Sequence, residues 1–84
     1  METNAEFCRR MEWVEGDVLC GGDDVPADHP KFVRLTAIGE SQVLGRPLAT
    51  NCTEGSEILL ELLPWTWRRL SGTEWQSLVD TQAR

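Results

Sequence analysis

His29 and three aspartates are the residues of this sequence whose types and spacing come closest to a chemical site. His29 is the only histidine of the chain, and Asp23, Asp24 and Asp28 precede it in one polar stretch. A histidine beside a carboxylate can transfer protons near neutral pH, and clustered carboxylates can hold a divalent cation weakly. The spacing, however, matches neither a calcium loop nor a zinc site. We therefore expect a polar loop here, with no catalytic residue, no metal and no cofactor.

The three cysteines do not form a recognisable site either. Cys8, Cys20 and Cys52 are widely and irregularly spaced, without a C-x-x-C pair, and one histidine cannot complete a zinc site with them. An odd number of cysteines also cannot form a complete disulfide framework. We expect free, mostly buried thiols.

Charge is distributed unevenly along the chain. The 84 residues include 8 basic and 14 acidic side chains, a net charge of −6, and residues 1–30 alone hold eight acids against two arginines. Nucleic-acid binding depends on Lys and Arg that neutralise phosphates, so direct binding is not expected unless Arg46, Arg68 and Arg69 converge. Acidic side chains either solubilise a surface or meet a basic patch on a protein partner. The candidate partner-binding acids are Glu12, Glu15, Asp17, Asp23, Asp24 and Asp28.

Tryptophan is the second candidate for partner contact. The chain has four tryptophans, and three of them lie between positions 65 and 75. Tryptophan fills cores and is also enriched at interface hot spots. Because a small fold cannot bury four indoles completely, we expect Trp65 or Trp67, beside Arg68 and Arg69, to remain partly exposed.

The first half of the chain is expected to begin with a short helix and continue as strands. Residues 5–13 have apolar side chains at helical spacing, although their end could also open a strand, and 21–30 is typical of a loop. Strict alternation predicts a strand over 31–38. A tight turn, with Gly39 supplying a positive φ, then leads to a second strand at 42–46, so the two form a hairpin.

The second half contains one ambiguous segment and one helix. Residues 57–63 fit either a strand or a helix by periodicity, and the surrounding strands favour the strand. A further strand is expected within 65–70. Thr73 as N-cap, with Gln76 three residues later, predicts a capping box and a helix over about 74–82.

Length and hydropathy limit the class of protein. Eighty-four residues are enough for one domain, which we place at 1–84, and no apolar run approaches the length of a membrane span. The N-terminal residues also lack the pattern of a secretory signal. The expectation is a cytoplasmic protein with no membrane partner.

Several short turn and strand motifs follow one another over about residues 14–70: Val14-Glu15-Gly16-Asp17-Val18, Val33 to Glu40 followed by Val43-Leu44-Gly45-Arg46, Glu54-Gly55-Ser56-Glu57, and Trp67-Arg68. In this order they resemble small SH3-like β-barrel proteins of phages and bacteria. The resemblance implies a mainly-β fold, an SH3-like barrel of about five strands with a C-terminal helix, and a phage or bacterial origin. It implies no catalytic residues.

Together these features favour a non-enzymatic protein-binding module. The specific hypothesis is a phage-encoded, anti-CRISPR-like inhibitor whose acidic face occupies the basic nucleic-acid-binding surface of a host protein or nucleoprotein complex in the host cytoplasm. One alternative is a phage structural or assembly protein, or a small self-associating adaptor, that uses its Trp and Leu surface to form a homo-oligomer. Another is a nucleic-acid-binding barrel in which Arg68, Arg69 and the tryptophans form a stacking platform, which the net charge disfavours.

Overall fold

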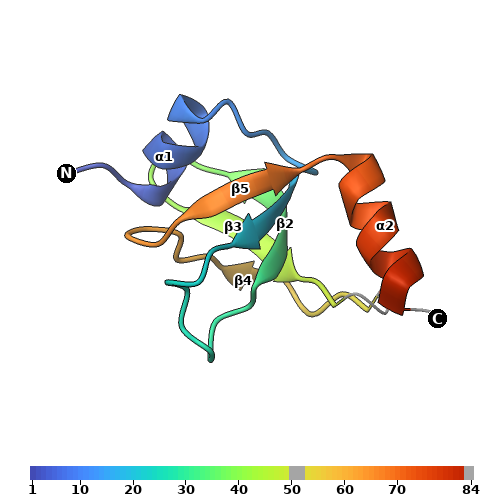
Figure 1. The fold of residues 1–84 in the computed structure, drawn as a ribbon. Helices are drawn as coiled ribbons and strands as arrows, with labels where there is room; N and C mark the ends of the chain where they lie inside the picture. Colours follow the sequence, from blue (N-terminus) through green and yellow to red (C-terminus); the bar gives the residue numbers. More distant parts are fainter. Residues whose placement is uncertain (50–52, 83–84) are drawn as a thin grey trace.

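A computed structural model describes residues 1–49 and 53–82, and it has a mainly-β architecture with a helix at each end (Figure 1). This confirms the predicted class, the short N-terminal helix and the C-terminal helix. In chain order the elements are α1 (Asn4–Arg10), β1 (Val18–Gly21), β2 (Phe32–Ile38), β3 (Val43–Pro47), β4 (Ile58–Leu59), β5 (Trp67–Leu70) and α2 (Gly72–Gln82).

The strands form one open antiparallel sheet in the order β4-β3-β2-β1-β5. β2 and β3 are the predicted hairpin, and their register shifts between Leu35 and Ala37. The last strand, β5, returns beside the first, so that Leu70 faces Val18 and Trp67 faces Gly21. The sheet therefore has β4 at one edge and β5 at the other.

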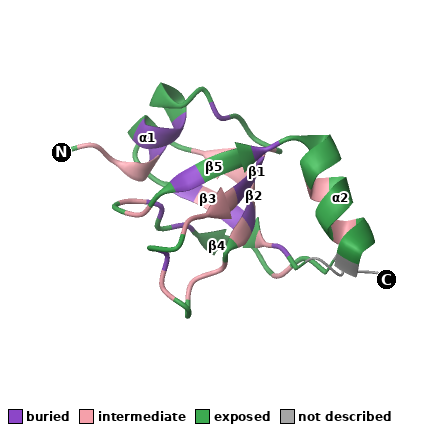
Figure 2. Cartoon of the chain, in the orientation of Figure 1, coloured by how far each residue is buried: buried purple, intermediate pink, exposed green. Residues whose placement is uncertain are grey.

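Alternation along the strands gives the sheet two unlike faces. Leu19 on β1 and Val33 and Leu35 on β2 point to one face, because successive side chains of a strand point to opposite sides. This first face carries most of the core. Figure 2 marks the buried positions along the ribbon in purple. Its buried residues are Ala5, Phe7, Cys8, Trp13, Leu19, Val25, Val33, Leu35, Val43, Leu60, Leu62 and Trp67.

The second face has a much smaller cluster. Its buried members are Val18, Leu48 and Leu70, with Cys20, Phe32 and Trp75 packed against them. The rings of Phe32 and Trp75 lie 5.5 Å apart. Of the α2 residues that the structure describes, Trp75 alone belongs to either cluster. α2 is therefore anchored to the sheet by one large side chain.

The ambiguous segment 57–63 is neither a full strand nor a helix. Only Ile58 and Leu59 form a strand with β3. Leu60 and Leu62 alternate into the core, as the strand interpretation predicts, but Ile58, which that interpretation places on the same face, is 37% exposed. Beyond β4 the backbone is held by the Asn4 carboxamide. Its Nδ2 donates to the Leu60 carbonyl at 3.3 Å, and its Oδ1 accepts from the amides of Leu62 and Leu63 at 3.1 and 3.0 Å. A side chain of α1 thus provides the hydrogen-bond partners that a neighbouring strand would otherwise provide to this backbone.

The predicted cap of the C-terminal helix was wrong by two residues. Ser71 is the capping residue: its Oγ accepts from the Glu74 amide, and a Glu74 carboxylate oxygen accepts from the Ser71 amide, each at 3.1 Å. Thr73 lies inside α2, which begins at Gly72. Either serine or threonine can cap a helix, and the end of β5 at Leu70 makes Ser71 the first residue free to do so.

The prediction of a positive φ at Gly39 was also wrong. Among the described residues the positive φ values belong to Glu12 and Gly16, at 61° and 95°. The hairpin instead closes with the Gly39 amide donating to the Gln42 carbonyl at 2.8 Å. A connection longer than two residues does not require the left-handed conformation at its first position.

Candidate protein-binding surface

The six acids proposed for partner binding form two groups, one at each end of β1. Glu12, Glu15 and Asp17 precede the strand, whereas Asp23, Asp24 and Asp28 follow it. A strand of four residues spans roughly 13 Å. The structure therefore does not bring the six carboxylates together into one patch.

Two of the six carboxylates are used within the fold. Asp17 accepts a hydrogen bond from the amide of Val14 at 2.9 Å. Asp24 accepts from the amide and the hydroxyl of Thr66, at 2.9 and 3.0 Å, and so ties the β1–β2 loop to the approach to β5. The acids with exposed side chains and no such internal task are Glu12, Glu15, Asp23 and Asp28.

The position of Glu12 follows from the way in which α1 ends. The Trp13 amide donates to the Cys8 carbonyl at 3.0 Å, and the Glu12 amide to the Arg9 carbonyl at 3.1 Å. These two bonds are those of a Schellman motif, which places Glu12 in the left-handed conformation that normally favours glycine. The rings of Phe7 and Trp13, 5.2 Å apart, add the apolar contact that accompanies the motif. An acidic side chain thus occupies a conformationally unfavourable position on the surface.

Exposed apolar side chains lie among the acids at this end of β1. Met11 is 41% exposed and Val14 is 60% exposed, and they alternate in sequence with exposed Glu12 and Glu15. We call these four residues, Met11, Glu12, Val14 and Glu15, the α1–β1 surface. A shallow groove of about 400 Å³ adjoins it, lined by Arg9, Trp13, Val14, Glu15 and Ile38.

The backbone under the α1–β1 surface is well fixed. The Gly16 amide donates to the Leu35 carbonyl at 2.7 Å, and the Leu35 amide to the Asp17 carbonyl at 2.9 Å. Arg9, which also lines the groove, donates to the carbonyls of Gly39 and Glu40, both at 2.9 Å. The exposed side chains are therefore displayed by a segment that is hydrogen-bonded to the sheet.

The loop with the other acids is anchored by packing. Val25 is only 4% exposed, and Lys31 donates to the Gly22 carbonyl at 2.9 Å. The His29 ring lies 5.2 Å from the ring of Trp65 and 5.5 Å from that of Trp67. Its Nδ1 is 2.9 Å from the Pro30 carbonyl, and within residues 1–49 and 53–82 no carboxylate is hydrogen-bonded to it. His29 thus packs against aromatic rings rather than forming an acid–base pair.

No metal site is assembled in the part of the chain that the structure describes. There, no group of three or more His, Cys, Asp or Glu side chains is arranged to hold an ion. Cys8 and Cys20 are free, as predicted, and Cys52 lies outside the described residues. Burial raises the pKa of the Cys8 thiol to about 11, so Cys8 stays protonated at neutral pH.

The tryptophans divide between core and surface. Trp67 is 4% exposed and its indole donates to the Leu62 carbonyl at 2.8 Å, so it is a core residue and is not available to a partner. Trp65 is half-buried and keeps an accessible part, as expected for a contact residue. Of the residues named for a nucleic-acid stacking platform, Trp67 is therefore buried, and Arg68 is paired with Glu74 at 3.0 Å.

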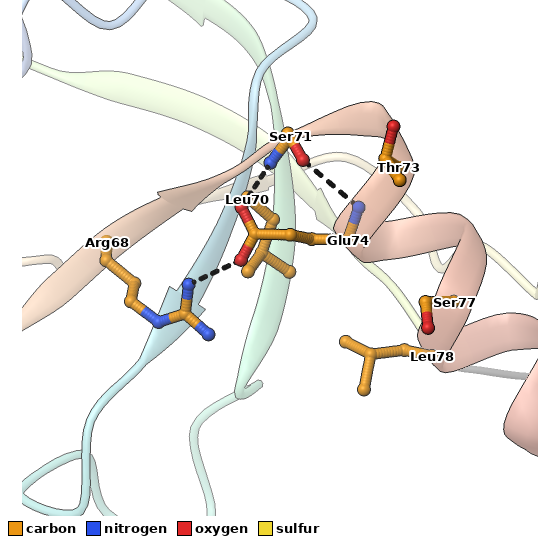
Figure 3. Close-up of a pocket in the computed structure, with 7 residues that line it drawn as sticks. All are labelled: Arg68, Leu70, Ser71, Thr73, Glu74, Ser77 and Leu78. Atoms are coloured by element: carbon orange, nitrogen blue, oxygen red, sulfur yellow. Dashed lines mark hydrogen bonds and ion pairs between the residues drawn. The ribbon is translucent and has the colours of Figure 1, made fainter.

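Sequence reasoning missed a groove between β5 and α2, shown in Figure 3. It encloses about 410 Å³ and is lined by Arg68, Leu70, Ser71, Thr73, Glu74, Ser77 and Leu78. Across its mouth Arg68 donates to Glu74 at 3.0 Å. A second cavity of about 330 Å³ adjoins Trp75, with Arg34, Leu48 and Glu54. The sequence signal that could have indicated this groove is the apolar stripe of Trp75, Leu78 and Val79 on α2. Periodicity, however, does not show whether other parts of the fold cover such a stripe.

Comparison with known proteins places this arrangement of elements in a family. A family model matches residues 2–76, which include α1, all five strands and Trp75. The chain belongs to DUF7241, a domain of unknown function. The DUF7241 match ends inside α2, so the distal turns of that helix lie beyond it. No curated protein and no solved structure matched the chain.

Among the described residues, neither helix combines the length and the apolar character that crossing a bilayer requires.

Proposed function

We propose that the protein is a non-enzymatic binding module whose α1–β1 surface docks on a basic surface of a partner protein. The observation that carries the proposal is the exposure of Met11 and Val14 directly beside the exposed carboxylates of Glu12 and Glu15. Apolar side chains supply the area that excludes water at an interface, and charges around them select the partner and speed its approach.

The partner's chemistry follows from that composition. A complementary surface would offer apolar side chains between lysines or arginines, and the net charge of −6 would steer such a protein toward this one. Protein surfaces that bind nucleic acid are basic for the same reason. The specific form of the proposal is therefore an anti-CRISPR-like, phage-encoded inhibitor that occupies the nucleic-acid-binding surface of a host defence complex.

Glu12 adds a second line of support. A residue other than glycine in the left-handed conformation is destabilising, and such strain concentrates at functional sites. Glycine at this position would strengthen the end of α1 but would remove a carboxylate from the α1–β1 surface.

We also propose that the sheet is an SH3-like barrel of five strands. The support is its strand order, in which β1 to β4 follow one another and β5 returns to pair with β1. The edges β4 and β5 are the two strands whose approach would close such a barrel.

The binding proposal is tested by reversing the charge of two acids before β1 and, in a separate control variant, of two acids after β1. The tagged protein is used to capture partners from host lysate at low and high salt, and retained proteins are identified by mass spectrometry. The test variant carries Glu12→Lys and Glu15→Lys. The matched control carries Asp23→Lys and Asp28→Lys, which changes the net charge equally and also alters exposed side chains only.

We expect a basic, nucleic-acid-handling protein to be retained at low salt and released at high salt. The Glu12/Glu15 variant should lose it, whereas the Asp23/Asp28 variant should keep it. Equal loss from both variants would indicate a non-specific charge effect and would contradict the proposal. Circular dichroism of each variant verifies the fold. Displacement of nucleic acid from the captured protein would then separate an inhibitor from a simple adaptor.

A further inference from the structure

We propose that the open side of β4 binds an extended peptide segment of a partner protein as an added antiparallel strand. The segment that fits has an apolar residue opposite Leu59 and a lysine or arginine two positions away on each side, facing Glu57 and Glu61. We call residues 57–61 the β4 edge. It shares no residue with the α1–β1 surface, and the proposal does not depend on the binding function proposed above.

The backbone of the β4 edge has hydrogen-bonding groups that point away from β3. β4 lies at one edge of the sheet, and β3 is the strand paired with it (Figure 1). The Leu60 amide donates to the Val43 carbonyl at 2.8 Å, so the polar groups of Leu60 face β3. Because successive residues of an antiparallel strand direct these groups to alternate sides, the amide and carbonyl of Leu59 point to the open side. Such groups at a sheet edge are a template for another strand.

The side chains of the β4 edge are apolar in the middle and acidic at both ends. Leu59 is 51% exposed and Ile58 is 37% exposed, and among the described strands only β4 exposes large apolar side chains to this extent. β5 therefore does not cover this edge, and a barrel built from this sheet would be open here. Glu57 is exposed and accepts from Thr36 Oγ1 at 2.5 Å through one carboxylate oxygen. Glu61 is also exposed, and no hydrogen bond or ion pair joins its carboxylate to another of the described residues.

The order of these side chains disfavours a second copy of the chain as the occupant. Two copies paired through the β4 edge, in the antiparallel register centred on Leu59, would place Glu57 of one copy directly opposite Glu61 of the other. Like charges directly opposite each other are destabilising, whereas opposite charges stabilise a strand pair. The β4 edge is therefore complementary to a foreign strand with basic residues at these two positions.

The arginines of the adjoining strands do not pair with the acids of the β4 edge. Arg34 is paired with Glu54, and Arg46 donates to the Gly55 carbonyl at 3.4 Å. A partner strand can therefore supply the cations that face the two acids. Its backbone would at the same time extend the sheet, so that main-chain hydrogen bonds give affinity and the alternate side chains give specificity.

The test is a titration of the isotope-labelled full chain with a synthetic peptide, followed by NMR of the backbone amides. The probe is acetyl-Ser-Lys-Thr-Val-Thr-Lys-Ser-amide, in which threonine and valine favour a strand and the valine lies opposite Leu59. We expect the amide signals of residues 57–61 to shift, and that of Leu59 to shift most. The dissociation constant should be on the order of 100 μM, because one short strand buries little area.

Two matched controls separate strand addition from simple attraction between opposite charges. Methylation of the valine nitrogen keeps the side chains and charges of the probe but removes the donor to the Leu59 carbonyl, so it should weaken binding about tenfold or more. Glu61→Lys should weaken binding of the original peptide about three- to fivefold. Because the pairing is antiparallel, glutamate in place of the first lysine of the peptide should restore affinity for this variant, whereas glutamate in place of the second lysine should not.

Several outcomes would overturn the proposal. One is the absence of shifts at residues 57–61 with millimolar peptide, and another is equal affinity of the methylated peptide, which would mean that charge alone attracts the probe. Shifts confined to residues 1–30 would place the peptide on the other acids of the chain. An unchanged affinity of Glu61→Lys would reject the charge pairing. The amide spectrum shows whether that variant is folded, and if it is not, the comparison of the two peptides on the wild-type chain decides.

Discussion

The two faces of the sheet differ in how they are covered. The first face is covered by α1, by Trp13 and Val25 from connecting segments, and by Leu60 and Leu62 beyond β4. In the part of the chain that the structure describes, the second face carries a small cluster around Val18, Leu48 and Leu70, and Trp75 of α2 packs on it against Phe32. The same sheet thus supports a continuous core on one side and a small cluster with adjoining cavities on the other.

The two faces therefore differ in role: the first contributes most of the stability of the domain, and the second is the more available to a partner. Free energy of folding comes mainly from apolar area removed from water, so the first face should dominate the stability of the domain. The second face is locally weaker, and regions of low local stability are those that adapt to partners. The following experiments test this division, beginning with the largest expected effect.

Truncation of one side chain on each face tests the comparison directly. Leu35 is 1% exposed on the first face, and Leu35→Ala should lower the free energy of unfolding by about 3 kcal/mol, because it removes buried apolar area and leaves a cavity. Trp75→Ala should cost only about 1 kcal/mol, since its ring is half-buried. Urea denaturation measures both. Equal losses would show that the second face contributes as much as the first.

Removal of the Asn4 carboxamide should have the next largest effect. Asn4→Ala leaves the amides of Leu62 and Leu63 and the carbonyl of Leu60 without their partners, at a cost of roughly 2 kcal/mol. Asn4→Asp is the control, because it keeps the acceptor for the two amides and replaces the donor to the Leu60 carbonyl with a second carboxylate oxygen. We expect it to be clearly more stable than Asn4→Ala in the same denaturation experiment. The reverse order would mean that the carboxamide does not hold this segment.

Alkaline pH should weaken the first face through Cys8. Burial raises the pKa of this thiol from 9.0 to about 11, so the unfolded chain loses the proton at lower pH than the folded one. The contribution is fully present below pH 9 and is lost as pH rises toward 11, by an amount on the order of 1–2 kcal/mol. The chain has no tyrosine and one lysine, so apart from its cysteines few side chains titrate in this window. Cys8→Ala should remove most of the slope in denaturation curves measured from pH 8 to 11.

The smallest effect concerns the α1–β1 surface, which lies at the end of the helix that covers the first face. Glu12→Gly should raise the free energy of unfolding by about 0.5–1 kcal/mol, because glycine accepts a φ of 61° without steric cost. Met11→Gly is the control and should destabilise, since Met11 has a φ of −83°. A loss of stability in Glu12→Gly would show that the carboxylate itself supports the fold, and would weaken the case for its role in binding.

Local patterns in the sequence predicted most of the elements of the fold. The alternation in 31–38 and the short segment 42–46 correspond to β2 and β3, and the helical spacing near the N-terminus corresponds to α1. These predictions succeeded because strand and helix periodicity are properties of neighbouring residues. The segment 57–63 was harder, because its backbone pairs first with β3 and then with the side chain of Asn4, which is far away in the sequence.

The candidate site was predictable only in part. The sequence identified Glu12 and Glu15 as acids available to a partner, and both are exposed. It could not separate them from Asp17 and Asp24, because the hydrogen bonds that occupy those carboxylates form only when the turns close. Nor could it distinguish Trp65 from Trp67: Trp67 begins β5 opposite Gly21 and its indole enters the core, whereas Trp65 lies before the strand and stays half-buried.

The amino-acid sequence by itself determined the mainly-β class, the helices at both ends and the concentration of negative charge in residues 1–30, because each depends on composition or on neighbouring residues. The tertiary structure alone decided that β1 divides the acids into two groups and that α2 is anchored by Trp75, with an apolar groove beside it. Those features arise where distant segments meet, and burial is a property of what lies opposite a side chain rather than of its position in the chain.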